Sequence, residues 1–486
     1  MKHFYLLLGI FFGVLFLSPT DSRAQWEPDV RLTNEPAGSY TSTTNAWCIA
    51  SSGDALHVVW YDDRDLNWEI YYKRSTDGGL SWEADTRLTT NASNSRLPSV
   101  AVSGSTLHVV WYDERVGNWE IYYKRSTDGG SSWGPDTRLT NDPFASFYPS
   151  VAVSGSVVHV VWHDQRDNSG IDEIYYKRST DGGTSWGTDI RLTNNIHNQQ
   201  YPSVTVSGTV VHIVWHDYRD GNSKIYYKRS TDGGTSWGTD TQLTNDSSGA
   251  GYPSAAVSGS SLHVVWYDYR DGNPEIYYKG STDGGSTWGP DTRLTNTISD
   301  SWYSSVTASG SAVHVVWYDN RDGNYEIYYK RSTDGGSSWG ADKQLTSESS
   351  FSFSPSVTAS GSIVHVVWQD FRDGNSEIYY KRDPTGNVTG IEIIDSEIPK
   401  EFSLSQNYPN PFNPNTTIQF ALPKSGFVSL KIYNLLGREV ALLVNEEKTY
   451  GTYTVKWNAS GMASGVYFYR MQVDSFIETR KLVFLR

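Results

Sequence analysis

EIYYKRSTDGGSSW, residues 120–133, is the stretch that decides the fold, because near-copies of it return about every 51 residues. Its first part, Ile121 to Arg125, alternates in character and is rich in aromatic residues, which is typical of a β-strand. Asp128-Gly129-Gly130 then supplies the positive-φ positions that a tight turn needs. Trp133 is placed to fold back beneath that turn. Each copy therefore predicts the corner of a β-hairpin.

Each repeat carries four strand signals, separated by short Gly, Ser and Asp turns. In one repeat they are residues 148–153, 158–162, 173–177 and 190–193, which predicts a four-stranded meander. The second strand has seven copies at steps of 51, 51, 53, 51, 51 and 51 residues, marked by His57, His108, His159, His212, His263, His314 and His365. This regular step with four strands per unit predicts an all-β chain that contains a seven-bladed β-propeller.

The two ends of the array predict how the ring closes. In the last repeat the turn has become Asp383-Pro384-Thr385-Gly386, and no fourth strand follows it. Residues 26–33 match residues 133–140, so the missing strand is present at the other end of the array. We expect this N-terminal segment to complete the seventh blade and close the ring.

The turn also resembles a known motif. Ser-x-Asp-x-Gly-x-x-Trp is similar to the Asp-box of the sialidase-type BNR repeat, and it stands intact six times. The resemblance implies a structural role for these boxes, and an Asp at this position is expected to accept backbone N–H bonds in its own turn. The residues concerned are Asp77, Trp82, Asp128, Trp133, Asp181, Trp186, Asp232, Trp237, Asp283, Trp288, Asp334 and Trp339. The seven repeated His are likewise expected to be hydrogen-bonded structural residues rather than metal ligands or catalysts.

The segments outside the repeats predict export. Residues 1–24 have the charged start, short apolar run and small-residue cleavage site of a secretory signal peptide, and no other stretch is apolar enough to span a membrane. We expect the propeller to occupy residues 25–383 and a linker 384–400, followed by a separate C-terminal domain 401–486. Asn410-Pro411-Phe412-Asn413-Pro414 and the ending 481–486 resemble the sorting domain of type IX secretion cargo. That resemblance implies a small β-sandwich, handling by the outer-membrane translocon and a secreted or cell-surface location; a catalytic or carbohydrate-binding sandwich is the alternative.

Composition narrows the function classes. The formal net charge is -14 and no basic run is present, which argues against nucleic acid or an anionic membrane as a partner. Cys48 is the single cysteine, so no intramolecular disulfide is possible, and a small buried residue is its expected role. Neither a cofactor nor a metal is predicted, since hairpin turns explain repeats such as Asp220-Gly221-Asn222. We expect a monomer.

One end of the propeller carries the candidate binding residues. The loops after the second strands hold a repeated Asp-x-Arg, which we interpret as ion pairs between blades, with a ligand-reading ring as the alternative. Variable aromatic residues gather at the same end, namely Tyr40, Trp68, Trp119, Phe144, Phe147, Trp302, Tyr325, Phe351 and Phe353. Their one-sided distribution suggests stacking against a glycan or an extracellular protein; the alternative is that they anchor loops over the blades.

A resemblance to sialidases extends to one further place. Arg96-Leu97-Pro98, Arg115 and Glu120 follow the order of an arginine and acid/base motif in those enzymes. However, Glu120 is a residue that recurs in the repeat. The further arginines that a carboxylate-binding triad needs are missing, and no Tyr nucleophile can be singled out. The sequence therefore favours a secreted binding module, followed by a sialidase-like exo-glycosidase and then by a structural surface protein.

Overall fold

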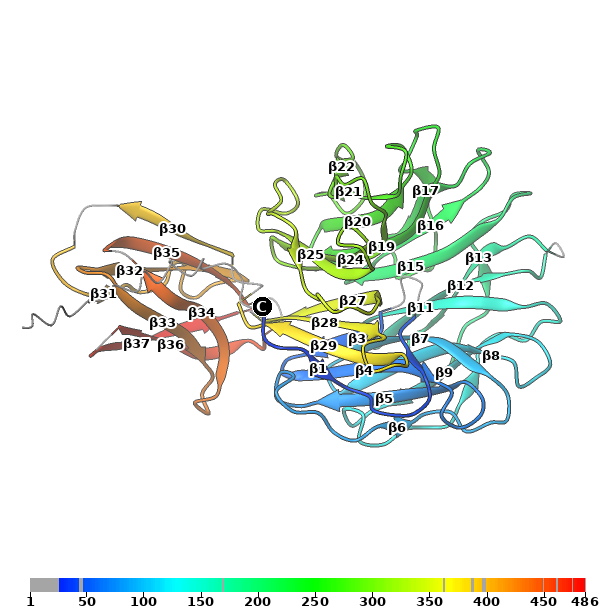
Figure 1. The fold of residues 1–486 in the computed structure, drawn as a ribbon, viewed down its shortest axis with the longest axis horizontal. Coiled ribbons are helices and arrows are strands. Elements are labelled where there is room, and N and C mark those ends of the chain that lie inside the picture. Colours follow the sequence, from blue (N-terminus) through cyan, green and yellow to red (C-terminus); the bar gives the residue numbers. More distant parts are fainter. Residues whose placement is uncertain are drawn as a thin grey trace, which may run out of the picture.

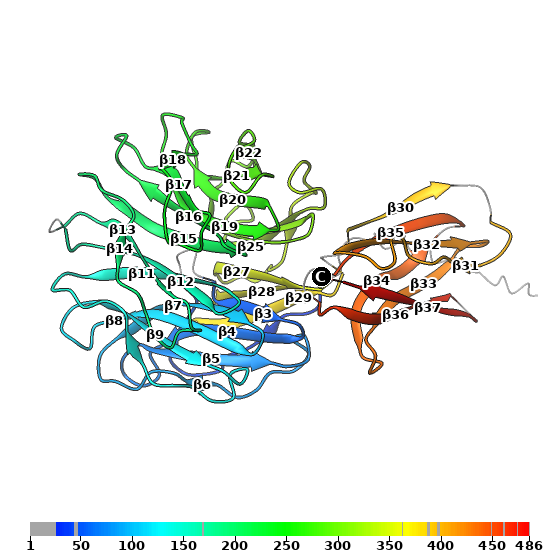
Figure 2. The same ribbon diagram turned by 180° about the vertical axis from the view of Figure 1, so that it is seen from behind.

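The computed structural model describes residues 26–42, 47–167, 170–361, 363–385, 389–395, 399–448, 450–459, 462–473 and 475–485. Every regular element in these ranges is a β-strand. Figure 1 shows the repeats as a ring of sheets and the last strands as a separate layered domain, and Figure 2 shows the same division from behind. The expected signal peptide, residues 1–24, lies outside the described residues. Within the described part of the chain no helix is long and apolar enough to cross a membrane.

The repeats form seven sheets, which we number as blades 1 to 7. Strands of blade 1 are β2 (Ser39–Tyr40), β3 (Ile49–Ser52), β4 (Ala55–Asp62), β5 (Glu69–Ser75) and β6 (Thr86–Arg87). Those of blade 2 are β7 (Ser95–Ser103), β8 (Thr106–Asp113), β9 (Glu120–Ser126) and β10 (Thr137–Arg138), and those of blade 3 are β11 (Ser146–Ser154), β12 (Val157–Asp164), β13 (Glu173–Ser179) and β14 (Ile190–Arg191). Blade 4 holds β15 (Gln199–Ser207), β16 (Val210–Asp217), β17 (Lys224–Ser230) and β18 (Thr241–Gln242), and blade 5 holds β19 (Ala250–Ser258), β20 (Ser261–Asp268), β21 (Glu275–Ser281) and β22 (Thr292–Arg293). Blade 6 holds β23 (Ser301–Ser309), β24 (Ala312–Asp319), β25 (Glu326–Ser332) and β26 (Lys343–Gln344). Blade 7 holds β27 (Ser352–Ser360), β28 (Ile363–Asp370) and β29 (Glu377–Asp383), together with β1 (Val30–Arg31).

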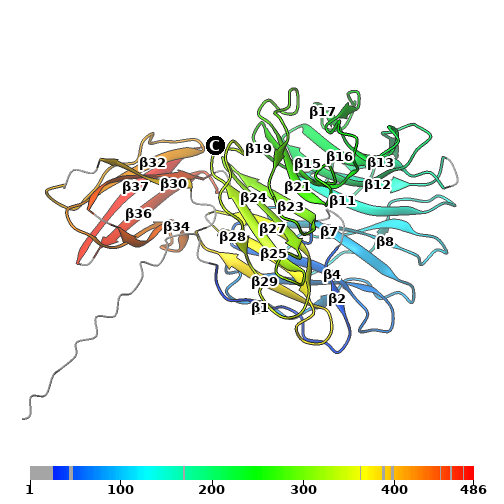
Figure 3. The ribbon, with the colours of Figure 1, turned by 45° about the horizontal axis from the view of Figure 1, so that its top comes forward.

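Each blade is an antiparallel meander, as the turn chemistry predicts. The first strands of successive blades contact one another around the ring, and Figure 3 shows β7, β11 and β15 side by side. The tryptophan of each second strand has no solvent exposure, as for Trp111 and Trp162. Cys48 is fully buried as well. Apolar side chains of adjacent blades thus share a core between the sheets.

The Asp-box holds each turn and also joins neighbouring blades. Asp128 accepts the Ser132 backbone N–H at 2.9 Å and the Ser126 hydroxyl at 2.7 Å, as expected for a structural box. The hydroxyl of Ser132, which donates to Asp128 at 2.5 Å, and these two bonds hold the pKa of the Asp128 carboxyl well below its usual range. Trp133 also packs edge-on against Tyr72 of the preceding blade at 4.9 Å between ring centroids. The box tryptophan therefore contacts the neighbouring blade as well as belonging to its own turn.

The repeated histidines have the structural role that the sequence predicts. The Nδ1 atom of each lies 2.7–2.8 Å from the hydroxyl of a third-strand tyrosine, for example His108 with Tyr123. Burial lowers the pKa of His108 to about 4, so the ring is neutral at pH 7. These pairs connect the second and third strands inside each blade.

The N-terminal strand closes the ring as predicted. Strand β1 pairs antiparallel with β29, with Val30 opposite Tyr380. Glu27 forms an ion pair with Arg382 at 2.6 Å, and Asp29 binds both Arg372 and Lys381 at 2.8 Å. Trp26 takes the place of a box tryptophan and packs on Tyr329 of blade 6 at 4.9 Å.

The C-terminal domain is a sandwich of two four-stranded sheets around its own core. One sheet contains β30 (Thr389–Asp395), β31 (Ser403–Leu404), β32 (Asn415–Leu422) and β35 (Gly451–Asn458). The other contains β33 (Gly426–Tyr433), β34 (Glu439–Lys448), β36 (Gly465–Val473) and β37 (Phe476–Phe484). Strand β30 pairs with β35 and lies inside the range expected to be a linker. A run of alternating Ile residues in that range is consistent with this pairing.

Candidate ligand-binding face of the propeller

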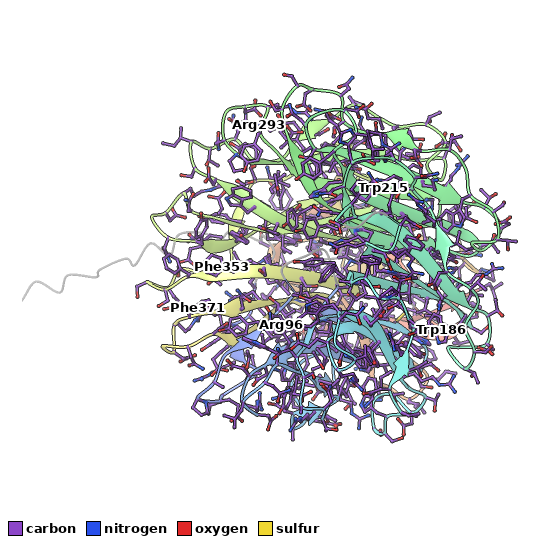
Figure 4. All side chains as sticks on the ribbon, turned by 90° about the vertical axis from the view of Figure 1, so that its right-hand side faces the viewer. Arg96, Trp186, Trp215, Arg293, Phe353 and Phe371 are labelled. Atoms are coloured by element: carbon purple, nitrogen blue, oxygen red, sulfur yellow. The ribbon has the colours of Figure 1, made fainter. Side chains whose placement is uncertain are left out.

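The two ends of the propeller differ in their chemistry. At the Asp-box end, a hollow of about 320 Å³ is lined by Ser, Gly, Ala and Val residues such as Ser51, Ser258 and Ala308, and none of its lining residues is ionisable. At the other end lie the loops that follow the second strands and those that lead into the first strands; we refer to this end as the loop face. Figure 4 views the propeller from the side away from the C-terminal domain, with Arg96 and Phe353 labelled on it.

The repeated Asp-x-Arg pairs on the loop face are mainly bonds within a blade. Arg115 binds Asp113 in a two-pronged arrangement at 2.6 and 2.9 Å, and its remaining nitrogen binds Asp136 of the same blade at 2.7 Å. Pairs between blades also occur, as between Arg270 and Asp246 at 3.1 Å. The predicted ring of ion pairs between blades is therefore wrong in its main partner, because the fourth strand brings its own Asp closer than the neighbouring blade does.

A row of tyrosines crosses the loop face near the first strands. In blades 2 to 7 the first strand has a β-bulge, as between Phe147 and Ser150. The residue after the bulge start has a positive φ in six blades, namely Leu97, Tyr148, Tyr201, Tyr252, Tyr303 and Ser354. Centroids of consecutive rings lie 4.8, 4.2 and 4.4 Å apart from Tyr148 to Tyr303. A non-glycine residue in this conformation costs about 1 kcal/mol or more, so the surrounding packing holds it there.

Arg96 is the functional candidate with the most distinctive surroundings. Its guanidinium lies 5.2 Å from the Trp68 ring centroid and 5.8 Å from that of Trp119. Its Nε is buried without a hydrogen-bond partner, and no carboxylate pairs with it among the described residues. The arginines of the Asp-x-Arg motif, by contrast, each bind an Asp. Arg96 is thus a cation held by two aromatic rings.

Arg96, Arg115 and Glu120 all belong to blade 2, but no hydrogen bond or ion pair joins Arg96 to Glu120 within the described residues. Glu120 has no solvent exposure and accepts bonds from Arg138 at 2.7 Å and from the Asp142 backbone N–H at 3.0 Å. Arg115 forms ion pairs with Asp113 and Asp136. The three residues predicted for a sialidase-like reaction therefore stand in separate contacts, and two of them hold the blade together.

The predicted aromatic residues contact neighbouring aromatic rings in groups on the loop face. Tyr40 contacts Trp68 at 5.1 Å, while Trp119 and Phe147 both contact Tyr112. Tyr325, Phe351 and Phe353 contact one another between blades 6 and 7, and Trp302 contacts Tyr267 at 4.8 Å. Phe144 and Phe351 are 40% and 49% exposed. The groups are consistent with stacking platforms and with loop anchors alike.

Sequence reasoning missed a buried polar cluster in blades 3 and 4. His163 and His216 occupy the middle position of Trp-x-Asp, where other blades have Tyr or Gln, and are 2% and 3% exposed. Asp172 is buried too and accepts a bond from Gln165 at 3.0 Å and another from Gln200. The departure from the repeat at this one position was the signal that could have revealed them. Among the described residues, no group of three or more His, Cys, Asp or Glu is arranged to hold a metal ion.

Comparisons with known proteins agree with this architecture. The model of the BNR repeat-like domain matches residues 13–264 and 170–366, and that of the secretion system C-terminal sorting domain matches residues 406–485. The protein is a β-propeller with a C-terminal sorting domain, and it belongs to the BNR repeat-like family. The sorting domain indicates type IX secretion, with export to the cell surface or beyond.

Solved structures resemble the chain at low sequence identity. The polysaccharide lyase Uly1 superposes with a TM-score of 0.52 at 10% identity, covering 74% of this chain and 99% of the lyase. A mutant Trypanosoma rangeli sialidase that displays trans-sialidase activity gives 0.42 at 11% identity, covering 80% and 83%. An α-L-arabinofuranosidase mutant from Fusarium graminearum gives 0.42 at 14%, covering 59% and 91%. No curated protein matches the chain.

Proposed function

We propose that this exported propeller is a binding module for glycans that carry acidic groups, and that it engages them on the loop face around Arg96. The observation that carries the proposal is the Arg96 guanidinium between Trp68 and Trp119, with no carboxylate partner in the described residues. An arginine that serves only the fold is expected to have a carboxylate or backbone oxygen as partner, as Arg115 does.

The chemistry of this arrangement suits an anionic sugar. A guanidinium stacked on aromatic rings keeps its N–H edge available for two parallel bonds to a carboxylate or sulfate. The Trp faces then offer stacking surface for the apolar side of a sugar ring. Because the whole chain is acidic, with a formal net charge of -14, attraction of an anion depends on this local cation and not on the general charge of the molecule.

A glycan array tests the proposal with the protein from residue 25 onward. The array carries uronate-containing, sialylated, sulfated and matched neutral oligosaccharides. We expect binding to acidic members, a loss of at least about tenfold in Arg96→Ala, and partial retention in Arg96→Lys, which keeps the charge but lacks the planar fork. Arg470→Ala, an exposed arginine on β36 of the sandwich, serves as the matched control. Equal binding by Arg96→Ala and the unmodified protein would contradict the proposal.

The same array distinguishes the sialidase-like alternative. After incubation the arrayed sugars are re-read for loss of terminal residues. Intact sugars with retained binding support a lectin-like module. Removal of terminal sialic acid by the unmodified protein and not by Arg96→Ala would show that a hydrolase is present and that binding alone is an incomplete description.

A further inference from the structure

The short turns between the first and second strands lie at the Asp-box end, and two of them contact the C-terminal domain. Each turn contains a Ser-Gly pair whose glycine has a φ of +58° to +62°, namely Gly53, Gly104, Gly155, Gly208, Gly259, Gly310 and Gly361. In blades 1 to 5 a Cβ atom on that glycine would meet no described atom within 4 Å beyond the adjoining residues. On Gly310 it would lie 2.7 Å from Asn458 Cγ, and on Gly361 3.2 Å from the Val440 carbonyl oxygen. The turns are alike in sequence, so the difference arises because the sandwich covers the last two blades.

The altered box of blade 7 accounts for the place of this contact. In blades 1 to 6 the first box glycine donates its N–H to a carbonyl of the strand turn at 2.8 Å, as Gly129 does to Ser105. The box therefore covers one flank of that turn. Blade 7 has Asp383-Pro384-Thr385-Gly386 in place of a box, and the chain leaves the propeller there. The backbone of β34 at Val440 lies beside the blade 7 turn instead.

The two domains also enclose a pocket of about 190 Å³. The propeller contributes Asp54, Gly361 and His365 to its lining, and the sandwich contributes Asn434, Val440, Met462 and Tyr467 among others. Burial raises the pKa of Asp54, and the positive charge of Arg438 in the sandwich opposes that shift. Figure 1 and Figure 3 both show the sandwich beside blade 7. Close packing, a shared pocket and opposite charges thus occur at one interface.

We propose that the Asp-box end of blades 6 and 7 is the seat of the chain's own sorting domain, and that the two domains form one rigid body. Glycine turns without a Cβ admit an Asn side chain and a backbone carbonyl, which a larger residue would displace. The loop face lies on the side away from the sandwich (Figure 4). A rigid seat therefore directs the loop face away from whatever holds the sorting domain during export. This inference does not depend on which ligand the loop face binds.

A disulfide across the seat tests the proposal in the full chain. A Cβ atom on Gly310 would lie 3.3 Å from Asn458 Cβ, close to the separation of about 3.5–4.5 Å in disulfides. Cys48 is fully buried and is expected to stay reduced. We expect Gly310→Cys with Asn458→Cys to cross-link at least about tenfold faster than Gly259→Cys with Asn458→Cys, as peptide mapping without reductant measures. Gly259 has a φ of +62°, so both pairs carry the same backbone strain. Equal rates would indicate a flexible tether and overturn the seat.

A second measurement needs no cysteine variant. Rotational correlation times from ¹⁵N relaxation are compared between amides of the sandwich and amides of the propeller. We expect equal values in the unmodified chain, whereas a sandwich value less than about half that of the propeller would overturn the proposal. Gly310→Asn places a side chain that tolerates positive φ against Asn458 and is expected to shorten the sandwich value, while Gly259→Asn leaves it unchanged. Equal effects of the two substitutions would contradict a seat on blade 6.

Discussion

At the scale of single residues, the second glycine of the Asp-box stands at a position where a larger residue does not fit. Gly183 has a φ of +81°, and a Cβ atom there would lie 1.9 Å from the Tyr123 hydroxyl oxygen of the preceding blade. That hydroxyl is buried and bonded to His108 at 2.8 Å. We expect Gly183→Ala to lower the free energy of unfolding by about 2–4 kcal/mol, from backbone strain and the displaced phenol. Urea midpoints measure this, with Gly187→Ala as the control near zero; equal midpoints would show that the contact between blades is adaptable.

Local features of single residues were predictable from the sequence, whereas contacts between different repeats were not. The Asp-box and the repeated histidines were predictable because turn chemistry and hydrogen-bonding capacity are local properties. The closeness of His216 and Gly251 was not, because one lies in blade 4 and the other in blade 5, and the two meet only in the folded ring. The contact of Trp133 with Tyr72 was not predictable for a related reason, since Tyr72 belongs to another repeat.

At the scale of the strand, the repeated histidines make stability depend on pH. Burial lowers the pKa of His57, His108, His159, His212 and His263 to about 4 and that of His365 to about 3, from 6.5. Below pH 6.5 the unfolded chain thus binds more protons than the folded chain. The free energy of unfolding therefore falls as the pH drops from 6.5 toward 4, by up to about 1.4 kcal/mol per pH unit for each histidine. We expect His159→Gln to reduce the slope of the free energy of unfolding against pH by up to about 1.4 kcal/mol per pH unit. Urea titrations between pH 7 and 4.5 measure this slope. A slope identical to that of the unmodified protein would show that this histidine does not titrate in that window.

At the scale of the whole molecule, the number of strand signals and their step were enough to predict an all-β propeller, while the C-terminal sandwich was expected from the resemblance to sorting domains. Periodicity is a global property that the sequence displays directly. The pairing of β30 with β35 was hidden, because a short strand at the edge of a sheet acquires its partner only when the domain folds. The loop-face groups were hidden in the same way, since Tyr40 and Trp68 meet only when β2 pairs with β4 in blade 1.

Closure of the ring by strand β1 is expected to stabilise the whole propeller. Strand β1 supplies the pairing of Val30 with Tyr380, the ion pairs of Asp29 and the packing of Trp26 on Tyr329. Deletion of residues 26–34 removes them together and leaves β29 as an exposed edge, with Glu377 buried and deprived of Arg31 and Thr33. We expect the truncated protein to melt at least about 5 °C lower, and blades 7 and 1 to lose amide-exchange protection first. A control that deletes the sorting domain from residue 401 should leave the propeller transition in place. If the N-terminal truncation melts at an unchanged temperature, the inter-blade cores alone hold the ring, and closure by β1 contributes no stability.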